Sequence, residues 1–265
     1  MRSEKVRFAG SSGDLLTARL DFPDAEPAAW ALFAHCFTCS KDLKAVVNLS
    51  RALNGAGLAV MRFDFTGLGE SEGDFADTSF ASNVDDLVAA AGFLEARYAA
   101  PKILVGHSLG GAAVLQAAAE VPSAAAVATI GAPADPAHVT HLLTGSLDEI
   151  RKEGEAEVIL AGRSFRIGRK FLEDLDETRQ AERIRSLDRA LIIFHSPIDM
   201  IVGIDNAARI YQTARHPKSF ISLDAADHLL TDPSDASYVG EVLAAWARKY
   251  IPECRSTAGR AAGQS

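Results

Sequence analysis

The sequence predicts an α/β protein with a mostly parallel sheet that is covered by helices on both faces. Near-continuous apolar runs, which are typical of strands buried on both sides, alternate along the chain with segments of helical periodicity. This alternation favours parallel strands joined by crossover helices. The chain has 265 residues, of which 48% are hydrophobic, which suits one large domain with a small insertion.

The first 133 residues supply most of the predicted sheet. Residues 6–8 and 15–20 flank a turn rich in glycine and serine and are expected to form a hairpin. Further strands are expected at residues 30–34, 58–65, 103–105 and 125–130. Helices are expected at residues 42–54, 79–98 and 109–121, where apolar side chains recur with helical spacing.

The alternation of predicted strands and helices is interrupted after Pro133. Residues 134–189 are more charged, and a helix at 138–150, a short hairpin at 157–160 and 164–167, and a short helix at 171–175 are expected there. We interpret residues 134–189 as a cap or lid inserted over the site. Its apolar side chains either line an acyl pocket or pack the cap internally; they are Phe165, Ile167, Phe171 and Leu172.

The α/β alternation resumes at residue 190. Strands are expected at residues 190–194 and 219–223, and helices at 204–214 and 237–250. The predicted domain core therefore comprises residues 1–133 and 190–252. Residues 253–265 are small and polar, and this tail is predicted to be disordered.

The strongest functional pattern lies at residues 103–117. An apolar run ends in Gly106-His107-Ser108-Leu109-Gly110 and leads directly into an alanine-rich helix pattern. This Gly-x-Ser-x-Gly order is typical of a nucleophile elbow, a sharp strand-to-helix turn that exposes the serine hydroxyl. The pattern predicts Ser108 as a nucleophile, and the Leu109 N–H at the helix N-terminus as an oxyanion donor.

A serine nucleophile needs a base, and the base needs a group that orients it. Catalytic groups in open α/β sheets gather at the carboxyl ends of strands. Asp199 follows the expected strand 190–194, and His228 follows the expected strand 219–223. The order Ser108, Asp199, His228 is that of a known class of serine hydrolases, and we predict these residues as the catalytic triad. Other acids remain runners-up for the orienting role: Asp205, Asp224 and Asp227.

The other histidines fit the role of base less well. His35, His107 and His195 lie at strand ends but have the wrong chain order or lie beside another candidate. His138 and His141 are three residues apart in an expected helix, an offset that can bind metal, but no third ligand is evident. We therefore predict no metal site. His216 lies beside Pro217 in an expected turn.

The second oxyanion donor is expected after strand 30–34, within His35-Cys36-Phe37-Thr38-Cys39-Ser40-Lys41. The Phe37 N–H is the predicted donor, and Cys36 is the neighbouring candidate. This segment resembles the His-Gly-Phe-x-x-Ser-Lys group of α/β-hydrolases of the serine-esterase type. Residues 62–71 are similar to the Asp-x-x-Gly-x-Gly-x-Ser loop of the same family.

The resemblance covers about residues 1–252. More narrowly, the chain is similar to hydrolase units that are joined to an OsmC-type peroxidase domain, which this sequence does not contain. The resemblance implies an eight-stranded α/β-hydrolase fold, a Ser108, Asp199 and His228 triad, and hydrolysis of carboxylic esters without a cofactor. We expect short-chain acyl esters as substrates. Cys36 departs from the usual glycine, and its Cβ limits the backbone conformations of the donor loop.

Three alternatives to a carboxylesterase remain. The same residues can cleave thioesters or acylated peptides. Cys36 and Cys39 form a Cys-x-x-Cys pattern at a strand-to-helix junction, where a redox role competes with a simple packing role, and packing is favoured. A non-catalytic binding module is the third alternative, although such proteins usually lose the serine or the histidine.

Composition restricts partners and compartment. The net charge is −8 and no basic block stands out, which argues against a nucleic-acid partner. No apolar run is long enough to cross a bilayer, and the N-terminus lacks the apolar core of a signal peptide. The 3 cysteines, Cys36, Cys39 and Cys254, indicate a reducing cytoplasm without a disulfide framework. A small-molecule ester is the expected partner, and the sequence gives no oligomeric state.

Overall fold

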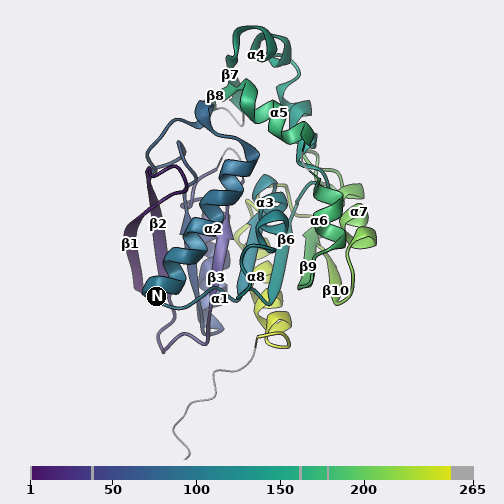
Figure 1. Cartoon of the computed structure of the whole chain (residues 1–265). Helices are drawn as coiled ribbons and strands as arrows, with labels where there is room; N and C mark the ends of the chain where they lie inside the picture. Colours follow the sequence, from purple (N-terminus) through teal and green to yellow (C-terminus); the bar gives the residue numbers. More distant parts are fainter. Residues whose placement is uncertain (1, 37–38, 161–162, 178, 252–265) are drawn as a thin grey trace, which may run out of the picture.

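The computed structural model describes residues 2–36, 39–160, 163–177 and 179–251. It has the α/β-hydrolase fold, an eight-stranded sheet between two layers of helices (Figure 1). The strand order is β1-β2-β4-β3-β5-β6-β9-β10. These strands are β1 (Arg2–Ala9), β2 (Leu15–Phe22), β3 (Ala29–Ala34), β4 (Leu58–Phe63), β5 (Ile103–His107), β6 (Ala126–Ile130), β9 (Ala190–His195) and β10 (Lys218–Ser222).

Most of the sheet is parallel, as predicted. Strand β2 pairs antiparallel with both β1 and β4, and the pairs from β4 through β3, β5, β6 and β9 to β10 are all parallel. The central strands are buried at every position, which accounts for their uninterrupted apolar sequences. Strands β1 and β10 form the two edges of the sheet.

Two apolar cores lie on opposite faces of the sheet. One contains Leu49 of α1 and Leu243 of α8, and the other contains Leu87 of α2, Val114 of α3 and Ile210 of α7. Figure 1 shows α2 and α3 in front of the sheet, with α8 behind it. The helix bounds are α1 (Lys44–Gly55), α2 (Phe80–Arg97), α3 (Leu109–Ala117), α7 (Asp205–Thr213) and α8 (Pro233–Ala247).

Side-chain caps account for where two helices begin. Ser79 accepts the Ser82 N–H, and the Ser82 hydroxyl accepts the Ser79 N–H, so α2 starts with a capping box. Asp232 accepts the Ser234 N–H ahead of Pro233, the first residue of α8. The predicted start of the closing helix at Ser237 is therefore too late, because Asp232 and Pro233 already form its start.

Residues between β6 and β9 form elements outside the main sheet, and we call residues 134–189 the cap segment. It contains a 3-10 helix (Pro136–Leu143), α4 (Leu147–Glu153), the hairpin β7 (Glu155–Leu160) and β8 (Arg163–Gly168), α5 (Arg169–Glu177) and α6 (Gln180–Arg185). In Figure 1, α4, β7, β8 and α5 stand above the helical layers. The single helix predicted at 138–150 is wrong, because the chain is divided there into a 3-10 helix and α4.

The apolar side chains of the cap segment are predicted either to line a pocket or to pack internally, and they differ in this respect in the structure. Ile167 and Phe171 are fully buried and Leu172 is nearly so, all within the same apolar core as α2 and α3. Phe165 is half-buried and lines a cavity. Within the described residues, no helix is long and apolar enough to cross a bilayer. The predicted tail at 253–265 and the hairpin turn at 161–162 lie outside the described residues.

Candidate active site

Ser108 lies at a sharp turn between β5 and α3. Its backbone has φ 55° and ψ −125°, a conformation that non-glycine residues rarely adopt. A Cβ on Gly106 would lie 2.2 Å from the Gly110 carbonyl oxygen, and one on Gly110 would lie 2.4 Å from that of Ala34. A side chain at either position would collide with the neighbouring backbone, so both residues must be glycine. The turn presents the Ser108 side chain at the carboxyl end of β5.

The structure brings the three predicted triad residues into one hydrogen-bonded row. His228 Nε2 lies 3.0 Å from Ser108 Oγ, and His228 Nδ1 lies 2.7 Å from Asp199 Oδ2. The loops that carry them follow β5, β9 and β10, so three carboxyl strand ends supply the row. The imidazole can accept the serine proton on one nitrogen while its other N–H donates to the carboxylate.

Asp199 is held in the ionised form. Burial acts to raise its pKa, but the hydrogen bond and charge of His228 outweigh burial, and the pKa lies below the ordinary 3.8. Asp199 Oδ1 also accepts the Ile201 and Val202 N–H groups at 2.8 and 2.9 Å. Backbone N–H groups thus hold one oxygen of the Asp199 carboxylate, while the other oxygen orients His228.

The runner-up acids do not reach His228 in this way. Asp205 lies in the first turn of α7. Asp227 accepts from the Thr231 N–H and hydroxyl and orders the loop that contains His228. Asp224 is exposed. Of the predicted acids, Asp199 is the one whose carboxylate is hydrogen-bonded to the histidine.

Two further histidines lie beside this row. His195 Nε2 is 3.8 Å from Asp199 Oδ2 but donates instead to the Val202 carbonyl at 2.7 Å, and burial lowers the pKa of His195. His107 Nε2 donates to the His228 carbonyl at 2.6 Å, and burial lowers the pKa of His107 to about 3. Both rings are neutral near pH 7 and support the loops around the row. No sequence pattern indicates the contact between His107 and the His228 loop.

The loop that follows β3 is anchored by a buried ion pair. Lys41 Nζ donates to Asp64 Oδ2 at 2.7 Å and to Glu70 Oε2 at 2.6 Å, while the Lys41 N–H donates to Asp64 Oδ1 at 2.7 Å. Burial acts to lower the pKa of Lys41, but the bonds to Asp64 and Glu70 outweigh it and raise that pKa. The network ties the end of the expected oxyanion loop to the glycine-rich loop after β4.

Of the two predicted oxyanion donors, the structure describes Leu109 but not Phe37. Leu109 is the first residue of α3 and directly follows Ser108, so its N–H has no acceptor within the helix. Phe37 lies outside the described residues. Cys36, the neighbouring candidate, is buried at the end of β3, and its carbonyl accepts the His35 Nδ1–H at 2.7 Å.

Cys36 and Cys39 form a disulfide, with their Cα atoms 5.2 Å apart. The Cys39 N–H also donates to the Cys36 carbonyl at 3.0 Å, so a backbone hydrogen bond joins the same two residues. The sequence predicts no disulfide framework and favours a simple packing role for both cysteines. The structure instead has this one bridge, between residues only three apart in sequence. His107 has a ring nitrogen within 4.8 Å of both sulfur atoms, but sulfurs bonded to each other are not free as metal ligands.

His138 and His141, whose offset in sequence can suit a metal ion, have no further ligand close to them among the described residues. The His138 and His141 rings lie 5.3 Å apart, and His138 Nε2 donates to the Ile201 carbonyl at 3.2 Å. Among the described residues, no further histidine, cysteine or acidic side chain joins these two in a ligand cluster. They sit on the 3-10 helix of the cap segment.

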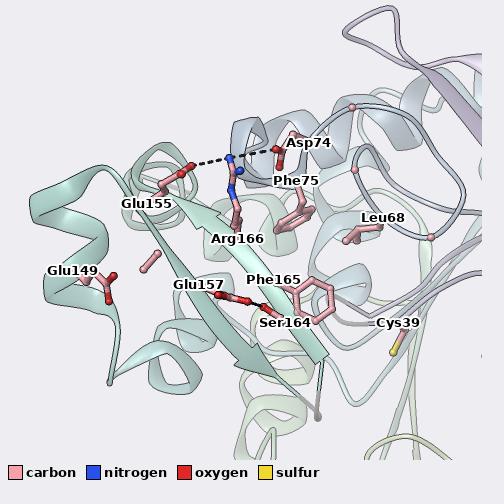
Figure 2. Close-up of a pocket in the computed structure, with 14 residues that line it drawn as sticks. Cys39, Leu68, Asp74, Phe75, Glu149, Glu155, Glu157, Ser164, Phe165 and Arg166 are labelled. Carbon is pink, nitrogen blue, oxygen red and sulfur yellow. Dashed lines mark hydrogen bonds and ion pairs between the residues drawn. The ribbon is translucent and has the colours of Figure 1, made fainter.

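A cavity of about 770 Å³ separates the β7–β8 hairpin from the glycine-rich loop after β4 (Figure 2). Its apolar lining includes Leu68, Phe75 and Phe165, and Cys39 also lines it. Figure 2 shows the Arg166 guanidinium between two carboxylates, with Glu155 at 3.1 Å and Asp74 at 3.3 Å. Two further carboxylates line it: Glu149 and Glu157. The cavity is therefore polar, with more negative than positive groups.

Gly131 is a site residue that the sequence analysis missed. It follows β6 with φ 54°, and a Cβ there would lie 3.3 Å from Asp199 Oδ2 and 3.4 Å from His228 Nδ1. Only the positive φ and the absence of a side chain let the backbone approach the Asp199–His228 bond so closely. A single sequence offers no signal for this, because the glycine lies outside any motif.

Gly131→Ala is expected to lower kcat/KM for ester hydrolysis roughly tenfold, because the added methyl displaces the imidazole from its hydrogen bond. Gly57→Ala is the matched control, since Gly57 also has a positive φ, 87°, but no atom within 4 Å of its Cβ position. Steady-state kinetics and thermal midpoints separate the two effects. Equal losses of activity in both variants would show that backbone strain, and not contact with His228, governs the effect.

The fold and the site together have the organisation of a hydrolase, with a serine at a strand-to-helix turn and a histidine and an aspartate on later strand ends. The chain belongs to the alpha/beta hydrolase family, whose sequence profile matches residues 28–259. No curated protein sequence matches the chain significantly.

Solved structures agree with this assignment. The esterase domain of a Rhodothermus marinus protein is 57% identical, with a TM-score of 0.80 over 95% of this chain and 100% of that one. Est1E from Butyrivibrio proteoclasticus, solved with ferulic acid, is 19% identical, with a TM-score of 0.75 over 93% of this chain and 99% of that one. Mouse alpha/beta hydrolase domain-containing protein 10 is 21% identical, with a TM-score of 0.74 over 93% and 99%. The last two show a shared fold.

Proposed function

We propose that this protein is a serine esterase that hydrolyses short-chain carboxylic esters through an acyl-enzyme. The observation that carries the proposal is the hydrogen-bonded row from Ser108 Oγ through His228 to Asp199, with 3.0 and 2.7 Å separations. The 57% identity to a domain described as an esterase adds support for esters as substrates.

The chemistry follows from the proton positions. His228 Nε2 removes the Ser108 proton as the oxygen attacks the ester carbonyl, and Asp199 stabilises the imidazolium that results. The Leu109 N–H, together with the proposed second donor Phe37, stabilises the oxyanion. His228 then gives its proton to the leaving alcohol. A water molecule cleaves the acyl-enzyme by the same route and regenerates Ser108.

The preference for short acyl groups rests on the space beside Leu109. A hollow lined by Phe65, Phe80 and Leu109 has a free volume of about 10 Å³, the size of a single water molecule. The larger cavity under the β7–β8 hairpin is lined by charged side chains, which a long acyl chain would have to desolvate. Neither space suits a long alkyl chain.

The test is hydrolysis of p-nitrophenyl esters from acetate to palmitate. We expect kcat/KM to be highest for the acetate and butyrate esters and to fall steeply with longer chains. A fluorophosphonate probe should label Ser108, identified by peptide mass, and should block hydrolysis in proportion to labelling. Labelling without turnover of any ester would retain a reactive serine but refute the substrate class. Highest activity on palmitate would refute the chain-length preference.

A further inference from the structure

We propose that Cys36 and Cys39 form a redox-active dithiol–disulfide site that controls the esterase, with small neutral or cationic thiols as its reductants. The inference rests on the proposed function, because ester hydrolysis is its readout. Its physical basis is the position of the disulfide between the catalytic row and the cavity under the β7–β8 hairpin.

One side of the disulfide faces the catalytic row. Both sulfur atoms lie within 4.8 Å of a ring nitrogen of His107, the residue immediately before Ser108. His107 in turn donates to the His228 carbonyl at 2.6 Å, and the two rings have centroids 5.0 Å apart. A change of bonding at the sulfurs therefore acts directly on the side chain that supports the histidine loop.

The two bridged residues are also held by neighbouring groups. The Cys36 carbonyl accepts from the Cys39 N–H and from His35 Nδ1, while Lys41, two residues after Cys39, is held by Asp64. A Cβ on Gly110 of α3 would lie 2.5 Å from the His35 carbonyl, so this segment packs against the nucleophile helix. In sequence, the bridge also encloses Phe37, the proposed second oxyanion donor. The disulfide thus keeps the surroundings of the oxyanion in one geometry.

The other side of the disulfide faces the cavity, from which a thiol can approach. Cys39 lines the cavity of about 770 Å³ and is 8% exposed, whereas Cys36 is 3% exposed and does not line it. A thiolate from solvent attacks Cys39 Sγ, forming a mixed disulfide and releasing the Cys36 thiolate. A second thiol attacks the mixed disulfide and leaves as the oxidised thiol. Two small thiols thereby supply the two electrons and two protons that convert the disulfide into two thiols.

The charge of the cavity selects the reductant. Four carboxylates and one guanidinium line it: Asp74, Glu149, Glu155, Glu157 and Arg166. This excess of negative charge repels an anionic thiol and attracts a cationic one, most strongly at low ionic strength. Cysteamine should therefore reduce the disulfide faster than thioglycolate does, by more than their thiol pKa values account for.

The experiment equilibrates the whole protein in oxidised and reduced dithiothreitol, traps thiols with iodoacetamide and measures hydrolysis of p-nitrophenyl acetate. In the oxidised form we expect Cys36 and Cys39 to escape alkylation, and full activity. Reduction should expose both thiols and lower kcat roughly tenfold or more, because the groups around the oxyanion lose their fixed positions. Reoxidation should restore the rate. Circular dichroism establishes that both forms are folded.

Three variants make the result specific. Cys39→Ser should have the activity of the reduced form and no response to dithiothreitol, whereas Cys254→Ala should respond like the unchanged protein. Cys36→Ser, which leaves only Cys39 at this site, should be alkylated faster than Cys39→Ser, which leaves only Cys36. Complete alkylation of both cysteines after oxidation, or equal kcat in both redox states, would overturn the proposal. Fluorophosphonate labelling of Ser108 tests the proposed function separately, so failure of the redox site and failure of the esterase are distinguishable.

Discussion

Ser108→Ala is expected to lower kcat for p-nitrophenyl acetate by about 10⁵-fold or more, the scale seen when a serine nucleophile is removed from a triad. The alanine retains the backbone turn but has no oxygen to form the acyl-enzyme. KM should change little, because the methyl group still fits between Gly106 and Gly110. Pre-steady-state experiments with excess substrate should also lose any burst of p-nitrophenol that acylation produces in the unchanged protein.

Ser123→Ala is a suitable control for this experiment. Ser123 donates to the Pro101 carbonyl at 2.9 Å, in the loop that precedes β6, and it takes no part in the site. Its variant should keep full activity and lose only about 1 kcal/mol of the free energy of unfolding. If Ser108→Ala retained more than a few per cent of the rate, Ser108 would not be the nucleophile, and both the acyl-enzyme and the triad would have to be abandoned.

Asp199→Asn should have the second largest effect, a loss of about 10⁴-fold in kcat. An amide can donate to His228 Nδ1 and so hold the imidazole in the tautomer that cannot accept the serine proton. Hydrogen bonding lowers the pKa of Asp199 below 3.8, so the carboxylate is ionised at all pH values above that. Because the neutral amide neither orients nor stabilises the imidazolium, the loss should be largest near neutral pH, where the carboxylate of the unchanged protein is ionised.

The pH profile of Asp199→Asn separates orientation from mere folding. A strongly basic solution supplies hydroxide, which partly replaces the missing general base, so the relative loss should shrink at high pH. Asp205→Asn is the control, since Asp205 is an acidic side chain in the first turn of α7 and was a runner-up in the sequence. It should keep nearly full activity. Comparable losses in the two variants would assign the effect to the loop after β9 as a whole.

Much of the fold could be predicted from local pattern. Runs such as residues 30–34 and 190–194 are apolar throughout because both faces of those strands are buried. The elbow glycines could be identified from their motif, although Gly110 is constrained by the distant backbone of Ala34. Ser108, Asp199 and His228 could be selected because each follows an apolar run and because their chain order is distinctive. Their mutual hydrogen bonds lay beyond prediction, since no pattern specifies distances between separate loops.

Other features depend on contacts that a linear pattern does not contain. Gly131 approaches the Asp199–His228 hydrogen bond at the carboxyl ends of the central strands, and His107 donates to the His228 carbonyl 121 residues away in sequence. The cysteine count predicts no disulfide framework, but a count does not show that Cys36 and Cys39 lie within bonding distance of each other. The cap segment was hardest to predict, because its short elements derive their stability from packing against the core and not from their own periodicity.

The two edges of the sheet bear on how copies of this chain behave at high concentration. An edge strand offers unpaired backbone groups to which a second chain can add. On β1, four of eight residues are charged, Arg2, Glu4, Lys5 and Arg7, so an added strand would have to strip water from ionised side chains. Strand β10 is only five residues long, and Pro217, immediately before it, lacks an N–H. Neither edge strand readily accepts a further strand, so both edges of the sheet disfavour edge-to-edge aggregation of this protein.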